Sequence, residues 1–114
     1  MSSISNKQNA QHYIWGENCS SWILAETEGL SIKQESMPPG TKEQLHFHFK
    51  AQQFFYILKG TATFYSNHEK STVEANTGIL IPAGVKHYIA NETQFEIEFL
   101  VVSQPTTTND RKNC

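Results

Sequence analysis

Short stretches in which apolar and polar residues alternate follow one another through the middle of the chain. Turn residues such as Pro, Gly and Asn separate them at intervals of roughly 8 to 12 residues, and Val, Ile, Phe and Tyr are frequent within them. The pattern predicts strands over residues 21–26, 30–37, 44–49, 53–58, 61–66, 71–75, 78–82, 86–91 and 95–103. No stretch has the period of a long amphipathic helix, so the pattern indicates an all-β sandwich or barrel.

The two ends of the chain are polar and lack this alternation. We expect a flexible N-terminal segment over residues 1–12, a single β domain over 13–104 and a flexible C-terminal tail over 105–114. A chain of 114 residues with 38% hydrophobic content is large enough for one compact core. Function should therefore be located within this one domain.

The strand expected over residues 53–58 is apolar on both of its faces. Phe55 and Ile57 share one face, while Phe54, Tyr56 and Leu58 share the other. A sheet that is buried on both sides needs a barrel interior on one side and a second layer on the other. We therefore expect a homodimer, with the partner subunit covering the outer face.

Charge and hydropathy exclude several classes of partner. The formal net charge is −2, and the only arginine, Arg111, lies in the polar C-terminal tail. No basic stripe that could bind nucleic acid or an anionic membrane is present, and no apolar run approaches the roughly 20 residues of a membrane span. The N-terminus lacks the apolar segment of a signal peptide, so we expect a cytoplasmic protein. We also expect no arginine in the barrel.

Two histidines share one face of the strand expected over residues 44–49. His46 and His48 are separated by a single residue, so their side chains project from the same side, about 6.5 to 7 Å apart at Cβ. Two imidazoles at this separation can converge on one cation. The spacing alone also fits a pair of surface histidines.

The residues around these histidines match two motifs. The segment from Gly40 to Gly60 fits G-x5-H-x-H-x4-E-x6-G, except that Gln53 occupies the glutamate position. Residues 76–91 fit G-x5-P-x-G-x2-H-x3-N and supply a third histidine, His87, except that Asn76 occupies the first glycine position and Gly78 lies two residues further on. On these motifs the chain resembles the cupin superfamily, which implies a small double-stranded β-helix, or jelly-roll barrel. The resemblance also implies a metal site formed by His46, His48, Gln53 and His87.

Gln53 is the main departure from the cupin pattern. An amide oxygen is a neutral and weaker donor than a carboxylate, so a divalent ion would keep its full formal charge and be a stronger Lewis acid. Two roles remain open for Gln53: it ligates the metal, or it bonds a bound water or fills the cavity wall. Three histidines with an amide can accept Fe, Mn, Ni, Cu or Zn.

Strand parity and the resemblance together suggest which residues line a pocket near the metal. This set comprises Gln44, Phe55, Ile57, Tyr88, Asn91 and Trp22. Without an arginine clamp, a sugar phosphate is a poor fit, although Lys33, Lys59 or Lys86 could partly substitute for an arginine. A small aromatic, carbonyl or enol substrate that chelates the metal is favoured. No general base is identified, although Glu43 and Tyr88 are weak candidates.

The leading functional hypothesis is a small-molecule enzyme that uses a three-histidine metal centre as a Lewis acid, of dioxygenase-like or isomerase/lyase-like type. One alternative is a non-catalytic cupin that binds or senses a small ligand. Another is a barrel whose metal is structural or has been lost. Nucleic acid and membrane are excluded as partners on the charge and hydropathy of the chain.

Overall fold

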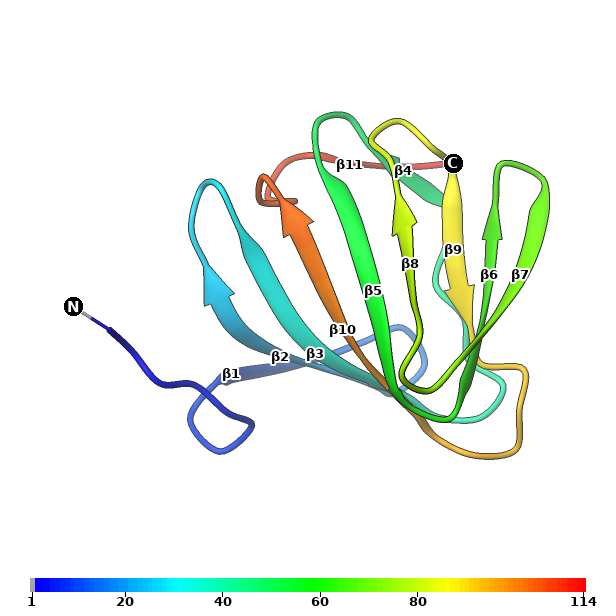
Figure 1. The fold of residues 1–114 in the computed structure, drawn as a ribbon, viewed down its shortest axis with the longest axis horizontal. Coiled ribbons are helices and arrows are strands. Elements are labelled where there is room, and N and C mark those ends of the chain that lie inside the picture. The colour runs from blue at the N-terminus through cyan, green and yellow to red at the C-terminus, as the bar shows by residue number, and fades with distance from the viewer. Residues whose placement is uncertain (1) are drawn as a thin grey trace.

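The computed structural model describes residues 2–114, which form eleven strands and no helix (Figure 1). One antiparallel sheet has the order β1 (Gln11–Trp15), β2 (Cys19–Glu26), β3 (Ser31–Met37), β10 (Ile97–Gln104), β5 (Gln52–Lys59), β8 (Gly78–Ile81). The other has the order β11 (Arg111–Asn113), β4 (His46–His48), β9 (His87–Ala90), β6 (Thr61–Ser66), β7 (Glu69–Glu74). The all-β jelly-roll prediction is confirmed. Within the described residues, nothing forms a helix long and apolar enough to cross a bilayer.

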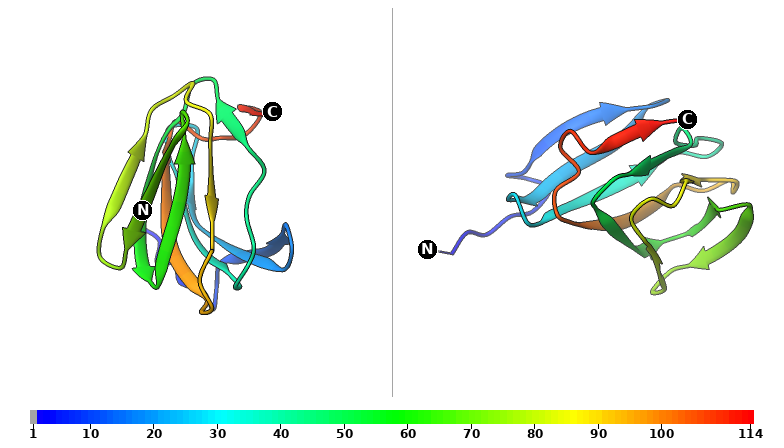
Figure 2. Two further views of the ribbon diagram at one scale, coloured as in Figure 1. Left: turned by 90° about the vertical axis from the view of Figure 1, so that its right-hand side faces the viewer. Right: turned by 90° about the horizontal axis from the view of Figure 1, so that it is seen from above.

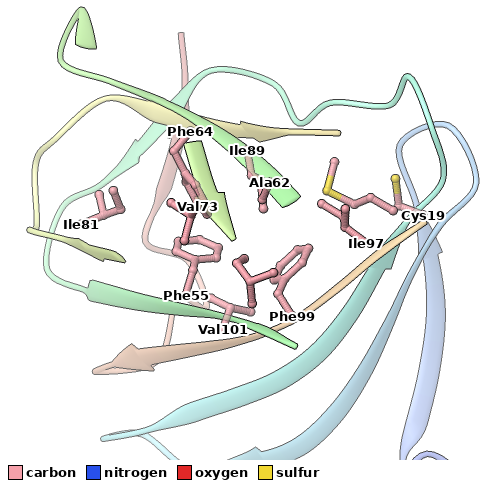
Figure 3. Packing of buried hydrophobic residues seen from close by; sticks show 12 residues of the cluster. Cys19, Phe55, Ala62, Phe64, Val73, Ile81, Ile89, Ile97, Phe99 and Val101 are labelled. Carbon is pink, nitrogen blue, oxygen red and sulfur yellow. The ribbon is translucent and has the colours of Figure 1, made fainter. Parts of the chain in front are cut away.

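The apolar core lies between the inner faces of the two sheets. Phe55 and Phe99 come from the six-stranded sheet, and Phe64 and Ile89 come from the five-stranded sheet; Figure 3 shows these side chains pointing toward one another. The rings of Phe55 and Phe64 are 5.0 Å apart at their centroids, in an edge-to-face contact. Alternation along each strand buries these residues and directs their neighbours outward.

The inner face of the six-stranded sheet changes from apolar to polar toward β3 and β1. The register pairs Val101 of β10 with Lys33 of β3 on one side and with Phe55 of β5 on the other. Paired residues project from the same face of a sheet, so Lys33 points to the same interior as Phe55. The core therefore fills one part of the interior, and the part under β3 and β1 is left for polar side chains.

The C-terminal segment packs across one end of the molecule, where Figures 1 and 2 show β11 in red beside β4. The buried carboxylate of Asp110 accepts hydrogen bonds from the backbone N–H groups of Lys50, at 3.0 Å, and Ala51, at 2.9 Å. This packing differs from the flexible tail expected for residues 105–114. At the other end, β1 begins at Gln11, inside the segment expected to be flexible. β11 is short and polar, so it has little hydrophobic pattern, whereas β1 has only five residues but contains Tyr13, Ile14 and Trp15.

The outer face of β5 exposes a group of large apolar side chains. Phe54 is 40% exposed, Leu58 38% and, on the neighbouring β8, Leu80 56%. Phe54 and Leu80 are direct partners in the register of the two strands. This is the face on which we expected a partner subunit. The homodimer stays a prediction.

Candidate metal centre

The backbone pairing of β4 with β9 brings three histidines together. His46 and His87 are direct partners in the register, and His48 lies two residues from His46 on the same face. All three side chains are buried, and one nitrogen from each lies within 4.8 Å of the others. Tetrahedral ligation at about 2.0 to 2.1 Å places nitrogens about 3.4 Å apart, so the three rings would draw closer together around an ion. The group could hold a metal ion.

Hydrogen bonds to backbone carbonyls set the tautomers of two of the rings. His46 Nδ1 lies 2.8 Å from the carbonyl oxygen of Gln44, and His87 Nδ1 lies 2.9 Å from that of Val85. A carbonyl only accepts, so each Nδ1 carries the proton and each Nε2 keeps a free lone pair. Burial lowers the pKa of His46 to about 3 and also lowers the pKa of His87. Both rings are therefore neutral and ready to donate to a cation.

Gln53 faces the same point as the histidines. Its Oε1 lies 3.1 Å from His87 Nε2, while its Nε2 donates a hydrogen bond to Ser103 Oγ at 3.0 Å. Because the His87 proton is on Nδ1, the two atoms that face one another, Nε2 of His87 and Oε1 of Gln53, are both acceptors. A shared cation satisfies two facing acceptors, so the donor set fits a divalent metal, with imidazole and amide ligands that suit Fe, Mn, Ni, Cu or Zn.

A cavity of about 270 Å³ opens beside this cluster. His46, His48 and Gln53 form one part of its wall, and Phe55 lies next to them. The remaining lining residues come mainly from β1, β3, β10 and the C-terminal segment: Tyr13, Trp15, Ser31, Lys33, Glu35, Glu43, Val101, Ser103, Thr107 and Arg111. The volume is near the lower end of the range for small-molecule sites.

Two carboxyl groups at this cavity are removed from water. Glu43 has a side chain that is only 14% exposed, and its Oε2 lies 3.9 Å from His46 Nε2 and 3.6 Å from Arg111 Nη1. Burial raises the pKa of Glu43 to about 8, and the nearby Arg111 opposes part of that increase. Burial also raises the pKa of Glu35. The Glu43 carboxyl can therefore hold or release a proton near neutral pH.

Several residues expected at the pocket lie elsewhere. Ile57 is in the apolar core, and Tyr88 stacks on Tyr65 at 4.7 Å on the outer face of the five-stranded sheet. Trp22 stacks on His12, and Trp15 is the tryptophan at the cavity. Strand parity directs Tyr88 and Trp22 away from the cavity, whereas Ile57 shares the inner face with Phe55 and lies further along β5, inside the apolar core.

The other two misplaced residues have structural roles. The side chain of Gln44 is exposed, and only its carbonyl oxygen reaches His46. The amide of Asn91 is buried and donates to the carbonyls of Met37 and Phe95, at 2.9 and 2.8 Å, so it ties two loops together. Of the two residues considered as a general base, Glu43 lies beside the histidines and Tyr88 does not.

The expectation of a barrel without arginine is wrong. Arg111 pairs with His48 in the register of β11 and β4, and its side chain lines the cavity. Lys33 and Glu35, both on β3, also line the cavity; Lys33 was considered only as a partial substitute for an arginine, and Glu35 was not singled out from the sequence. Their alternation with Ile32 and Gln34 was the available signal, but a charged face of a strand is normally interpreted as facing solvent.

Known proteins share this architecture. A family model described as Cupin domain matches residues 34–103, more than half of the chain. An uncharacterized protein of Methanocaldococcus jannaschii is 29% identical over 80 residues, 70% of this chain and 64% of that protein. An oxalate-binding protein of Thermotoga maritima is 32% identical over 66 residues, 58% of this chain and 54% of that protein. The chain thus spans less than two thirds of the length of these curated relatives.

Similarity to solved structures extends over nearly the whole chain. The polyketide cyclase RemF from Streptomyces resistomycificus superposes with a TM-score of 0.85 at 17% identity, covering 99% of this chain and 85% of that chain. At this identity the similarity concerns the fold alone. The family match, the two-sheet jelly roll and the three converging histidines agree with one another. The chain belongs to the cupin domain family.

Proposed function

We propose that the protein is a metal-dependent enzyme that moves a proton on, or eliminates a group from, a small carbonyl-bearing molecule. The observation that carries this proposal is the buried carboxyl of Glu43, 3.9 Å from a histidine nitrogen that faces the candidate metal position. A divalent cation held by His46, His48 and His87, with Gln53 as a fourth donor, would supply Lewis acidity toward a substrate oxygen. An isomerase- or lyase-like reaction uses both features.

In this reaction Glu43 acts as the general base. Its carboxylate accepts the proton from the carbon next to the substrate carbonyl, while the electron pair of the broken C–H bond moves onto the carbonyl oxygen. Return of the proton to another carbon gives an isomer, and loss of a group from the neighbouring carbon gives an elimination product. The backbone N–H of Ile89, 3.3 Å from Glu43 Oε1, and the guanidinium of Arg111 orient the carboxyl.

The rest of the cavity supports chemistry on a small molecule. Phe55 and Val101 form an apolar wall that reduces the access of water, which strengthens electrostatic interactions at the centre. RemF, a polyketide cyclase, shares the fold, and the Thermotoga relative binds oxalate according to its name. These proteins support a small oxygen-rich substrate for this chain.

Removal of the metal should abolish exchange of substrate hydrogen with solvent. Protein is treated with a chelator and reloaded with Zn(II) or Mn(II), then incubated in D₂O with a panel of 2-oxo and 3-oxo acids and their neutral analogues. We expect NMR signals of hydrogens next to the carbonyl to disappear only with reloaded protein, because proton abstraction needs both the Lewis acid and Glu43. Fully loaded protein that binds panel members but exchanges none of them would indicate a non-catalytic binding protein.

Replacing Gln53 with glutamate should increase metal retention. The Oε1 atom of Gln53 faces His87 Nε2, and a carboxylate at this position adds a negative charge to an otherwise neutral donor set. We expect the affinity for Zn(II), measured by competition with a chromogenic chelator, to rise about tenfold or more. The matched control is Gln52→Glu, because Gln52 is exposed and precedes Gln53 on the same strand. Equal gains in both variants would indicate that Gln53 does not face the ion.

A further inference from the structure

We propose that the cavity binds its ligand by a carboxylate group, and that Arg111 and Lys33 are the side chains that recognise this group. The inference builds on the proposed function because it names the chemical class of the substrate for the same cavity. The evidence for it is different: two cationic side chains face the cavity from opposite sheets. Neither cation holds the metal or takes up the proton, although Arg111 also helps to orient the carboxyl of Glu43.

The backbone register alone directs these two cationic side chains toward the cavity. Arg111 is paired with His48, so its side chain leaves β11 on the face that carries the histidines. Lys33 belongs to β3 of the other sheet, in the same row as Val101 and Phe55, and its Nζ donates to Tyr13 Oη at 3.0 Å. A ligand in the cavity therefore has a guanidinium on one side and an ammonium on the other.

The hydrogen bonds of Arg111 leave part of its guanidinium unused. Nε donates to Asn113 Oδ1 at 2.8 Å, and Nη2 makes a long contact of 3.5 Å with the carbonyl oxygen of Gln44. Nη1 lies 3.6 Å from Glu43 Oε2, beyond an ordinary hydrogen bond. N–H groups on both terminal nitrogens are therefore available, and two such groups side by side match the two oxygens of a carboxylate.

The balance of charges at the cavity also favours an anionic ligand. Gln53 adds no negative charge where the cupin motif has a glutamate, so a divalent cation on the histidines would keep its full charge. Together with Lys33 and Arg111, this positive charge exceeds what Glu35 and Glu43 can supply even when both are ionised. A carboxylate suits the cavity better than a phosphate, because a single guanidinium is present and residues 2–114 contain no helix N-terminus.

The test measures anion binding to chelator-treated protein, so it needs neither metal nor turnover. Malonate is titrated calorimetrically into wild type and Arg111→Gln, with malonamide as the uncharged probe of similar shape. We expect malonate to bind more tightly than malonamide, and R111Q to weaken malonate binding about tenfold. The matched control is Lys112→Gln, which removes a positive charge from the next residue of β11, an exposed side chain on the other face; we expect less than about a twofold change.

A second variant shows whether R111Q weakens binding only because the C-terminal strand has lost its packing. Arg111→Lys keeps the charge but lacks the paired N–H groups, and we expect its affinity for malonate to lie between those of wild type and R111Q. Equal affinities of R111Q and K112Q, or equal binding of malonate and malonamide, would overturn the proposal. Inorganic phosphate that binds more tightly than malonate would overturn the carboxylate assignment. Failure of the solvent-exchange test leaves these affinity ratios unchanged, so the two proposals fail separately.

Discussion

Replacing His46 with alanine should remove stoichiometric divalent metal from the purified protein. His46 is 1% exposed and central to the cluster, with its ring centroid 5.0 Å from that of His48 and 4.4 Å from that of His87. Residues that only support a metal ligand typically change affinity 10- to 100-fold, so loss of a ligand from a three-histidine site should lower affinity by more than about 100-fold. Elemental analysis of protein purified without added metal, followed by a Zn(II) competition titration, measures the change.

The control for this prediction is His68→Ala. His68 is exposed in the turn between β6 and β7 and lies outside the cluster, so its removal should leave metal content unchanged. Circular dichroism establishes that both variants are folded before metal is counted. A His46→Ala protein that retains full metal content would show that the histidines are not the ligands, and the proposed Lewis-acid chemistry would then lose its basis.

Much of the architecture could be predicted, because the alternation of apolar and polar residues determines where the strands lie and which of their faces are buried. The nine strands expected from the sequence all occur, with ends that differ by a few residues, since Phe55, Ile57 and Phe99 must face a common interior. The glycines of the motifs have a physical reason as well. Gly60 has φ of +81°, and a Cβ at this position would lie 2.8 Å from Ile97 Cγ2, so only glycine fits without strain.

Of the two strands that were not predicted, β11 contains no apolar side chain. β11 is exposed along its whole length, and its position depends on backbone pairing with β4 and on the hydrogen bonds that the Asp110 carboxylate accepts from the N–H groups of Lys50 and Ala51. These contacts span about 60 residues of sequence and leave no periodic signal. Arg111 was consequently assigned to a solvated tail, although this strand places it beside the histidines.

The position of the charged face of β3 at the cavity was missed for a different reason. Lys33 and Glu35 alternate with less polar neighbours, and this is the usual pattern of a strand with one face in solvent. In this molecule the polar face is directed toward the cavity, while the outer positions Ile32 and Gln34 are half-buried. Parity correctly separates the two faces of a strand, but it does not identify which face is inside when the interior is a polar cavity.

Replacing Glu43 with glutamine should lower kcat by about 100- to 10,000-fold, the range associated with loss of a general base. Glutamine retains the shape of the side chain and an oxygen that can accept the hydrogen bond from Ile89 N–H, but it cannot take up a proton. Because a base must be deprotonated to act, the wild-type rate should rise as pH increases through the pKa of Glu43, which burial raises and a bound cation would lower. This rise should be absent in the variant.

Metal content and ligand affinity distinguish a chemical role of Glu43 from a structural one. The variant should keep the metal of the wild type, because Glu43 lies outside the set of four donors, and its affinity for malonate should change far less than its rate. Glu74→Gln, a change at an exposed position on β7, is the matched control and should leave the pH profile intact. A Glu43→Gln enzyme with the wild-type rate and pH dependence would assign the base to another group at the cavity, and the buried Glu35 would be the next to test.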